Sequence, residues 1–402
     1  MMNPLNIPRL LGEIVAAIAV AEVAVMFVVP KVAPGINGVA GGLLGATMLA
    51  LLAGPVILWR VVAANRRVVT VPVATDKDTP RKLVAATAGI FTVGLAVTVT
   101  ATLLLNREIN NEARSRFERL TERLVGEAQR RVVQPRYGMA GARGVYAASK
   151  SVDRSQFAAY VASRDLAKEL PGAVGFGFIQ RVIRTDVEAF VAAARADGAP
   201  NFAIRSLAAP GSPLENSPDL YVVKHCFPKE RNAPVWGLDV GSDPIRREAA
   251  ERAATSGQPA LSGQTTLWQD GAHQPGFIYL LPVYNNGTKP KTPEERLAAL
   301  TGLIYTPIIL DEALAGVIES VDGALDFEIF QGEIRSSETK IFDFDKHLDG
   351  VQGTADASLY AGRMFERGTP VSIGGQTWTF VTSTTRAFHA GVDRTMPTLM
   401  AA

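Results

Sequence analysis

The stretch Leu267–Tyr284, LWQDGAHQPGFIYLLPVY, decides the kind of fold. Its second half, Phe277–Tyr284, has the aromatic and β-branched residues of a half-buried strand. Gly271 and the Gln-Pro-Gly sequence at 274–276 supply turn chemistry before that strand. We therefore predict a β-hairpin with a polar tip, in which His273 is a solvated turn residue. The mix of Trp, Asp, His and Tyr residues in this hairpin is typical both of a binding pocket and of a sheet with a solvent-exposed edge.

Helices and strands around this hairpin follow an α+β order, in which helices pack against one face of a sheet. Before the hairpin and in its first half, helical or strand-like patterns cover five segments: 155–163, 173–183, 186–198, 244–256 and 259–268. After it, a smaller set of strands with one short helix occupies 302–385. The segment Asn285–Leu297 is rich in Gly, Pro and charge, which predicts a connector. We therefore predict two α+β subdomains, at 150–290 and 291–385.

Three apolar runs precede this α+β part, at 10–29, 39–59 and 83–105. Each has about the twenty residues needed to cross the hydrocarbon of a bilayer, so we predict a transmembrane hairpin within 1–60 and a third span. The loop 61–82 carries most of the nearby Lys and Arg, which places it in the cytoplasm. The chain is therefore expected to be a multi-pass protein of the bacterial inner membrane, with everything after Leu105 in the periplasm. Residues 386–402 are expected to begin a truncated fourth span.

Glu13 and Glu22 lie within the first apolar run, where carboxylates are costly and often functional. The alternative is a structural hairpin, in which Glu22 faces Thr47 or a glycine-rich helix face. Beyond the third span, residues 106–149 are assigned to a stalk helix. An apolar residue recurs every three or four positions from Asn106 to about Arg131, and a stretch rich in Gly and Ala follows. That stripe fits a homodimer seam, a face for the following domain, or both at different heights.

Composition excludes several classes of function. The formal net charge is +2, and no run of Lys and Arg is interleaved with aromatic residues, so nucleic acid is not expected as a partner. The single cysteine, Cys226, cannot form an intramolecular disulfide. It stands beside His225 without a third group to orient a nucleophile, which favours a buried or loop cysteine over a catalytic one.

Metal and cofactor sites are not predicted either. None of the four histidines has zinc-site spacing, and no phosphate-binding loop is present in the sequence. The acidic run Asp343–Gly350 misses the spacing of an EF-hand, so we interpret it as a solvated turn. The chain is therefore not expected to be an enzyme and has no predicted catalytic residue, metal or cofactor.

An ordered series of segments resembles the CHASE domain, an extracytoplasmic sensory module. The segments are GARGVYAAS, FAAYV, GFGFIQRV, WGLDVGSDPIRREAAERA, GQPALSGQTTL and QPGFIYLLPVY. The similarity covers Ala142–Tyr305 well and extends less distinctly to Thr382. It implies a stalk helix and two tandem PAS-like subdomains, of which the membrane-distal one binds a small ligand. It also implies the input half of a signalling receptor, such as a two-component histidine kinase or a diguanylate cyclase, whose output domain is not in this sequence.

The resemblance also implies a ligand pocket in the distal subdomain, and we place six residues there: Phe178, Trp236, Val240, Arg246, Trp268 and Leu280. Arg246 stands where the related cytokinin receptors use an aspartate, and Leu280 stands where they use a threonine. A guanidinium favours a carboxylate or phosphate, so the expected ligand is a small anion rather than an adenine. The competing hypothesis is an interaction or dimerisation module without a ligand, in which aromatic side chains fill the pocket. If Leu280 faces the pocket, Tyr279 must face the opposite side of the sheet.

Overall fold

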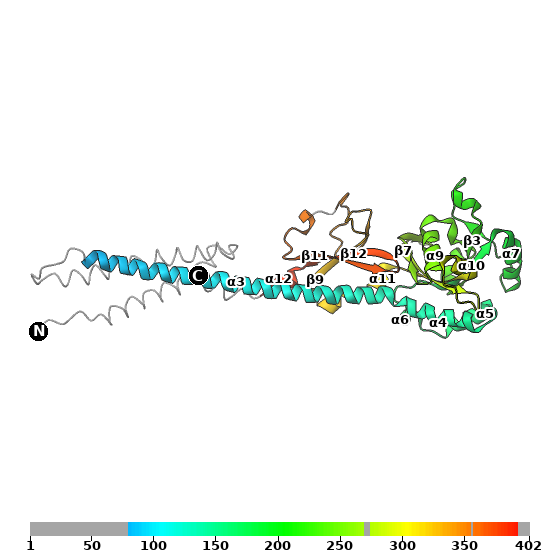
Figure 1. Ribbon diagram of the computed structural model, residues 1–402, viewed down its shortest axis with the longest axis horizontal. Helices are drawn as coiled ribbons and strands as arrows, with labels where there is room; N and C mark the ends of the chain where they lie inside the picture. The colour runs from blue at the N-terminus through cyan, green and yellow to red at the C-terminus, as the bar shows by residue number, and fades with distance from the viewer. Residues whose placement is uncertain (1–78, 269–273, 355–356, 393–402) are drawn as a thin grey trace, which may run out of the picture. The chain divides into compact units, whose positions relative to one another are not determined.

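The structure, a computed structural model, describes residues 79–268, 274–354 and 357–392. The predicted spans at 10–29 and 39–59, with Glu13 and Glu22, lie outside the described residues, as do His273 and most of the predicted fourth span. The chain divides into two compact units, and the larger one, Phe117–His389, contains both β-sheets. The fold is α+β: a long helix is followed by two sheets, one mixed and one antiparallel (Figure 1).

Helix α3 (Thr79–Val133) covers the predicted third span and most of the predicted stalk. No helix in the described part of the chain is both long enough and apolar enough to cross a membrane. α3 ends at Val133, close to the predicted end of the periodic helix near Arg131. The stalk predicted for 106–149 is therefore two helices and not one, because α4 runs over Pro135–Ala148. Pro135 explains the break, since proline lacks an N–H and its ring clashes with the carbonyl of the preceding turn.

Within the larger unit, the apolar stripe of α3 packs against the second sheet and the residues that follow it. The Phe117 ring lies 5.6 Å from Phe365 and 6.5 Å from Phe388. The hydroxyls of Thr121 and Thr382 lie 3.1 Å apart in a buried contact. This part of the stripe therefore serves as a face for a domain, and the predicted dimer seam stays a prediction.

The first sheet has the strand order β2-β4-β3-β1-β8-β7-β5, with β6 paired to β7 outside this path. Its strands are β1 (Phe176–Ile183), β2 (Arg205–Ser206), β3 (Asp219–Phe227), β4 (Leu238–Asp239), β5 (Ala260–Leu261), β6 (Thr265–Leu267), β7 (Gln274–Tyr284) and β8 (Leu300–Ile308). The antiparallel pairing of β6 with β7 confirms the predicted hairpin. β7 also pairs with β8, whereas β6 is a short strand beside its end, so only one of the two hairpin strands is central.

β8 follows the predicted connector at Asn285–Leu297, yet it pairs with both β1 and β7 of the first sheet. The short helix α10 (Pro293–Ala299) overlaps the end of that connector and begins with a capping box at Thr292. The change from the first sheet to the second therefore comes after Ile308.

Helices cover both faces of the first sheet (Figure 1). Helix α9 (Pro244–Ser256) has the predicted bounds and packs four alanines, Ala249, Ala250, Ala253 and Ala254, into the buried core of one face. Helix α7 (Val187–Ala196) contributes Phe190 and Ala194 to a separate core that also contains Val182 and Val222. The remaining helices of this part are α4, α5 (Arg154–Ala162), α6 (Leu166–Glu169) and α8 (Lys229–Asn232).

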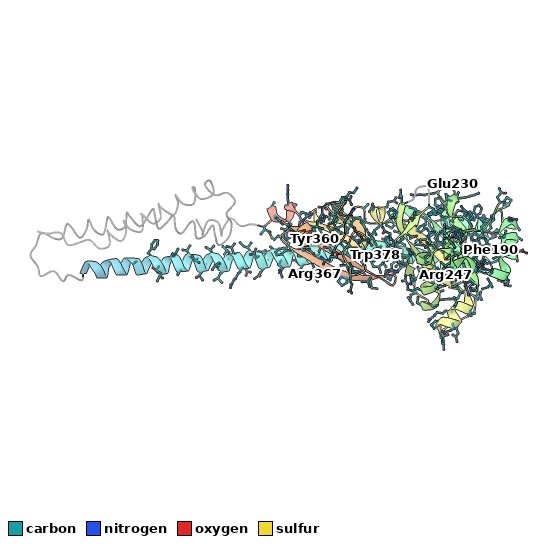
Figure 2. All side chains as sticks on the ribbon, turned by 90° about the horizontal axis from the view of Figure 1, so that it is seen from above. Phe190, Glu230, Arg247, Tyr360, Arg367 and Trp378 are labelled. Carbon is teal, nitrogen blue, oxygen red and sulfur yellow. The ribbon has the colours of Figure 1, made fainter. Side chains whose placement is uncertain are left out.

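The second sheet is antiparallel, with the order β10-β9-β12-β11. Its strands are β9 (Leu325–Gln331), β10 (Lys340–Asp343), β11 (Glu366–Ile373) and β12 (Gln376–Thr384), and the short helices are α11 (Leu310–Ala313) and α12 (Arg386–Ala390). Gly374 and Gly375 join β11 to β12 with φ angles of 56° and 79°, which side chains rarely adopt. This turn reaches the first sheet, because the Leu261 N–H donates to the Gly374 carbonyl over 2.9 Å. Nearby, the Phe277 and Trp378 rings lie 5.0 Å apart (Trp378 is labelled in Figure 2).

Candidate functional site

Most of the predicted pocket residues meet on the face of the first sheet that α9 covers. Val240 and Leu280 are buried in the same core as the α9 alanines, and the half-buried Trp268 packs against that core. Tyr279, the neighbour of Leu280 on β7, is absent from this core and lines a cavity beside α3 and α4 instead. The predicted alternation of these two residues is therefore confirmed.

Phe178 does not join this group, which corrects the sequence-based placement. Its ring stacks on Tyr146 of α4 at 4.3 Å and lies 6.4 Å from the His225 ring. The next residue, Ile179, packs into the α9 core instead. Because successive side chains of a strand point to opposite faces, Phe178 faces away from Leu280.

Trp236 lies at the margin of the same core, near the β2–β4 edge of the first sheet. Its indole N–H donates to the Lys224 carbonyl over 3.0 Å, and the Arg154 guanidinium lies 4.0 Å from its ring. It also lines a cavity of about 440 Å³, together with the loop 198–203. Two further cavities, of about 780 Å³ and 510 Å³, lie beside α7 and beside α3 and α4. None of these three cavities is lined by Val240, Arg246 or Leu280.

Arg246 is held in the first turn of α9 by two sets of contacts. The Asp243 carboxylate caps the helix by accepting the Arg246 backbone N–H over 2.9 Å. The guanidinium donates from Nε to the Thr265 hydroxyl over 3.3 Å and from Nη2 to the Thr266 carbonyl over 2.6 Å. Strand β6 therefore positions the Arg246 side chain, a role for Thr265 and Thr266 that the sequence did not reveal.

The charge of Arg246 is buried and has no ion-pair partner among the described residues. The residue is 4% exposed. Burial lowers the pKa of Arg246, because removal from water disfavours the charged form. A buried charge without a partner is costly, so an anion beside Arg246 would be favourable.

The neighbouring Arg247, which is labelled in Figure 2, does have ion-pair partners. Its guanidinium pairs with Asp219 over 2.6 Å and with Glu251 over 2.8 Å. Arg247 thus pairs with a carboxylate of its own helix, a contact that Arg246 lacks among the described residues.

His225 and Cys226 do not form a catalytic pair. A register irregularity between β1 and β3 lies beside them, and the His225 ring stacks 5.5 Å from Phe157, whereas Cys226 packs into the α9 core. Burial lowers the pKa of His225 to about 3 and raises the pKa of the Cys226 thiol to about 12. A neutral thiol and a neutral imidazole on different sides of the strand leave Cys226 as the buried cysteine favoured from the sequence.

Among the described residues, a group that could hold a metal lies at the second sheet. Asp326 and Glu328 of β9 meet Asp345 and His347, and one possible ligand atom from each lies within 4.8 Å of all the others. The interpretation of Asp343–Gly350 as a solvated turn is therefore wrong for part of the run, since Asp343 has a buried carboxylate. The signal in the sequence was the pair of acidic residues two positions apart on an apolar strand, which places both on one face.

The chain is similar to a known domain family and to solved structures. The family model of the CHASE domain matches residues 150–342, and no catalytic domain is found. No curated protein matches the chain. One similar solved structure is an extracellular ligand binding receptor from Desulfohalobium retbaense DSM5692, with 12% identity and a TM-score of 0.43. The match covers 67% of this chain, which spans 40% of the length of that receptor chain.

A second similar structure is the Methyl-accepting Chemotaxis protein X, with 14% identity and a TM-score of 0.30. That match covers 73% of this chain and 100% of the other. Neither likeness is close enough to transfer a ligand or the role of a residue. The family match nevertheless confirms the resemblance carried by the sequence segments, and residues 150–342 of this chain are a CHASE domain, an extracytoplasmic sensor module.

Proposed function

We propose that this chain is the periplasmic input part of a bacterial transmembrane receptor, and that its first sheet binds a small anionic molecule at Arg246. The observation that supports the ligand class is that Arg246 is only 4% exposed and that its guanidinium has no ion-pair partner among the described residues. Arginine grips a carboxylate or phosphate through two parallel hydrogen bonds, which a neutral ligand cannot provide.

The surroundings of Arg246 add to the attraction for an anion. Arg246 lies in the first turn of α9, a helix of 13 residues whose N-terminus carries partial positive charge. A guanidinium has five N–H donors, and the bonds to Thr265 and Thr266 use only Nε and Nη2. The other N–H groups of the guanidinium are donors of the kind that a carboxylate or phosphate oxygen accepts. Thr265 and Thr266 hold the guanidinium in one orientation.

Ligand binding is proposed to displace α9, because Leu280, Val240 and the four alanines fill the space between this helix and the sheet. A ligand shifts such an equilibrium only if it binds the displaced arrangement more tightly. Arg252 of α9 links this movement to the second sheet, since its guanidinium donates to the carbonyls of both Leu261 and Gly374.

The wider receptor follows from the sequence predictions. We propose three N-terminal spans in the inner membrane, a homodimer through the spans and the stalk, two PAS-like subdomains with the first sheet distal to the membrane, and a cytoplasmic output domain beyond this sequence. Ligand binding would then bias one of two arrangements of the stalk helices across the dimer.

The test is thermal unfolding of the purified full chain in detergent against panels of organic acids, phosphates, amino acids and purines. A ligand at one hundred times its Kd should stabilise the folded protein by about 2.7 kcal/mol. Arg246→Gln should abolish that shift, because it removes the charge that the anion needs. Arg195→Gln is the matched control, since Arg195 binds the Phe202 carbonyl outside the α9 core, and it should keep the shift.

A second candidate function is an interaction module without a small ligand. The observation in its favour is that the space beside Leu280 and Val240 is filled by the protein's own side chains. A shift from anions that Arg246→Gln abolishes would exclude this candidate. The absence of any shift, or an equal shift in Arg246→Gln, would contradict the anion-sensing proposal and favour the interaction module.

A further inference from the structure

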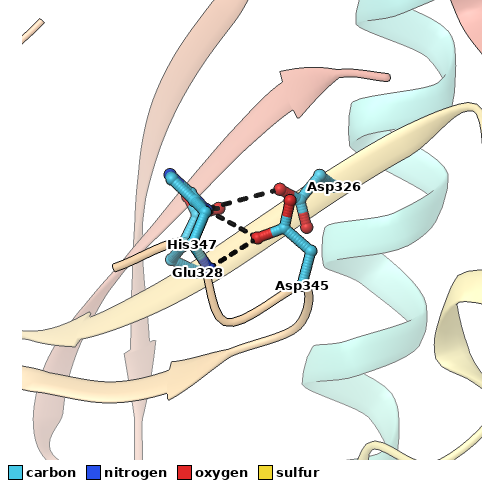
Figure 3. Close-up of side chains that lie close together, drawn as sticks. All are labelled: Asp326, Glu328, Asp345 and His347. Carbon is cyan, nitrogen blue, oxygen red and sulfur yellow. Dashed lines mark hydrogen bonds and ion pairs between the residues drawn. The ribbon is translucent and has the colours of Figure 1, made fainter. Parts of the chain in front are cut away.

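A compact group of acidic side chains lies on the second sheet, apart from Arg246 (Figure 3). Asp326 and Glu328 stand two residues apart on β9, so both point to the same face. The segment after β10 turns back over this face and brings Asp345 and His347 to them. We call these four residues, together with the adjacent Asp343, the acidic cluster.

Two carboxylate oxygens of the acidic cluster are buried without a hydrogen-bond partner in the part of the chain that the structure describes. Glu328 is 0% exposed, and its Oε1 accepts no hydrogen bond. The Oδ1 atom of Asp343, on a side chain that is 4% exposed, is in the same state. Both atoms point into the cluster, since they lie 3.6 Å and 3.8 Å from His347 Nδ1. Buried acceptors of this kind need a partner, and two of them aimed at one point indicate a missing ligand.

The acidic cluster carries more negative charge than the neighbouring cationic side chains neutralise. Its four carboxylates face two permanent cations: Arg363, which pairs with Asp326 and Asp345, and Lys340, which pairs with Asp343. Lys340 is shared further with Asp349 outside the cluster. Burial and the neighbouring carboxylates of Asp326 and Asp343 raise the pKa of Glu328 to about 9. The cluster therefore lacks positive charge at its most buried carboxylate.

We propose that the acidic cluster binds one divalent cation of the first transition series, with the ligand preferences of Mn²⁺ or Zn²⁺. The donor set supports this class, because carboxylate oxygens suit Mn²⁺ and an imidazole nitrogen suits Zn²⁺ and its neighbours. An ion such as Ca²⁺ or Mg²⁺ prefers oxygen ligands alone and would gain little from His347.

The spacing of the ligand atoms fits such an ion. His347 Nδ1 lies 2.7 Å from Asp345 Oδ1, 3.6 Å from Glu328 Oε1 and 3.7 Å from Asp326 Oδ2. Around an ion with bonds of about 2.1 Å, neighbouring ligand atoms lie about 3.0 to 3.5 Å apart. Small side-chain movements therefore suffice to close the cluster around a cation. The exposed Asp345 leaves one side of it open to solvent.

Binding of the ion would fix the turn at 343–347 against β9. His347 and Asp345 come from the turn, whereas Asp326 and Glu328 belong to the central part of the second sheet. The Tyr360 hydroxyl donates to Glu328 Oε2 over 3.2 Å and would hold that carboxylate in place. The cation would thus order the second sheet independently of any ligand at Arg246.

The experiment is equilibrium dialysis of the purified, tag-free full chain in detergent, stripped of metal with a chelator, against MnCl₂, ZnCl₂, CaCl₂ and MgCl₂. We expect one Mn²⁺ or Zn²⁺ per chain and a rise in the unfolding temperature on loading. Glu328→Gln should weaken binding at least about tenfold, because it removes the buried charge at nearly constant volume. Asp345→Asn, at the exposed edge, tests the same site with less risk to folding.

Asp349→Asn is the matched control, because Asp349 is an exposed neighbour that pairs with Lys340 outside the cluster. It should bind metal as the unmodified chain does. The proposal is overturned if neither Mn²⁺ nor Zn²⁺ binds saturably, if Ca²⁺ is preferred, or if Glu328→Gln and Asp345→Asn bind as tightly as Asp349→Asn.

Discussion

His225 shows how one buried side chain ties the stability of the first sheet to pH. It is 0% exposed, and burial lowers its pKa to about 3, with Lys224 and Arg154 adding to the effect and Asp153 opposing it. The folded protein therefore keeps a neutral imidazole, whereas the unfolded chain binds a proton below about pH 6.5. The stability contribution is complete above pH 6.5 and is lost as the pH falls from there toward 3.

His225→Phe should remove this pH dependence while keeping the stack on Phe157. Between pH 7 and pH 5 the unmodified protein should lose about 2 kcal/mol more of its free energy of unfolding than the variant does. Denaturant unfolding at both pH values measures the difference, in which the contributions of the carboxylates cancel. Equal losses in the two proteins would show that His225 is protonated in the folded state.

Individual site residues were predicted from the sequence only in part. The sequence placed Leu280 and Tyr279 on opposite faces, because alternation along a strand is a local property. It placed Phe178 on the wrong face, since the phase of β1 relative to β7 depends on pairing with β8 between them. It dismissed the acidic run at 343–350, because the partners Asp326 and Glu328 lie on another strand and are joined to it only by folding.

At the scale of elements, α9 illustrates how small side chains set the position of a helix. Its four buried alanines let the helix lie close against β7 and β8, where a larger side chain has no space. The caps at Asp243 and Gly257 define its two ends, and both residues are visible in the sequence. This is why the predicted bounds of α9 are correct.

Ala250→Leu should therefore destabilise the protein by about 1 to 3 kcal/mol through overpacking. Glu248→Leu introduces the same side chain on the exposed face of α9 and should change the free energy of unfolding by less than about 0.5 kcal/mol. Chemical denaturation of both variants measures the effect. Equal stability of the two would mean that the alanine face tolerates added volume.

Two elements show what the local sequence can and cannot predict. The end of α3 at Val133 lies close to the predicted end of the periodic helix near Arg131, and its cause, Pro135, is local. The membership of β8 could not be predicted locally, since a connector rich in Gly and Pro says nothing about which strands pair after it. Long-range pairing is set by the whole sheet and not by the segment itself.

At the scale of the whole larger unit, the two sheets meet at the β11–β12 turn. Gly374 has a φ of 56°, and a Cβ added there would lie 2.7 Å from the Leu261 backbone nitrogen. The Gly374 carbonyl accepts hydrogen bonds from the Leu261 backbone N–H and from the Arg252 guanidinium of α9. One residue thus couples the edge of the first sheet, the proposed sensing helix and the second sheet.

Gly374→Ala should cost at least about 2 kcal/mol, because backbone strain and a steric clash act together. Gly362→Ala is the matched control: its φ is 87°, and a Cβ there meets nothing within 4 Å, so it carries the strain without the clash. Calorimetry should show one cooperative transition for the Gly362 variant and two separated transitions for the Gly374 variant. A single transition in both would show that the sheets are coupled elsewhere.

The position of β8 also limits how CHASE domains of this kind can be recombined in the laboratory. A chimaera joined in the glycine-rich segment at 285–297 would take β8 from one parent and its partners β1 and β7 from the other. A junction after Ile308 keeps that sheet intact, but the incoming module must still present a backbone N–H to Gly374 and an apolar ring to Trp378. Whether such a chimaera folds would thus depend on how well the two sheets match at Gly374 and Trp378, and less on the choice of linker.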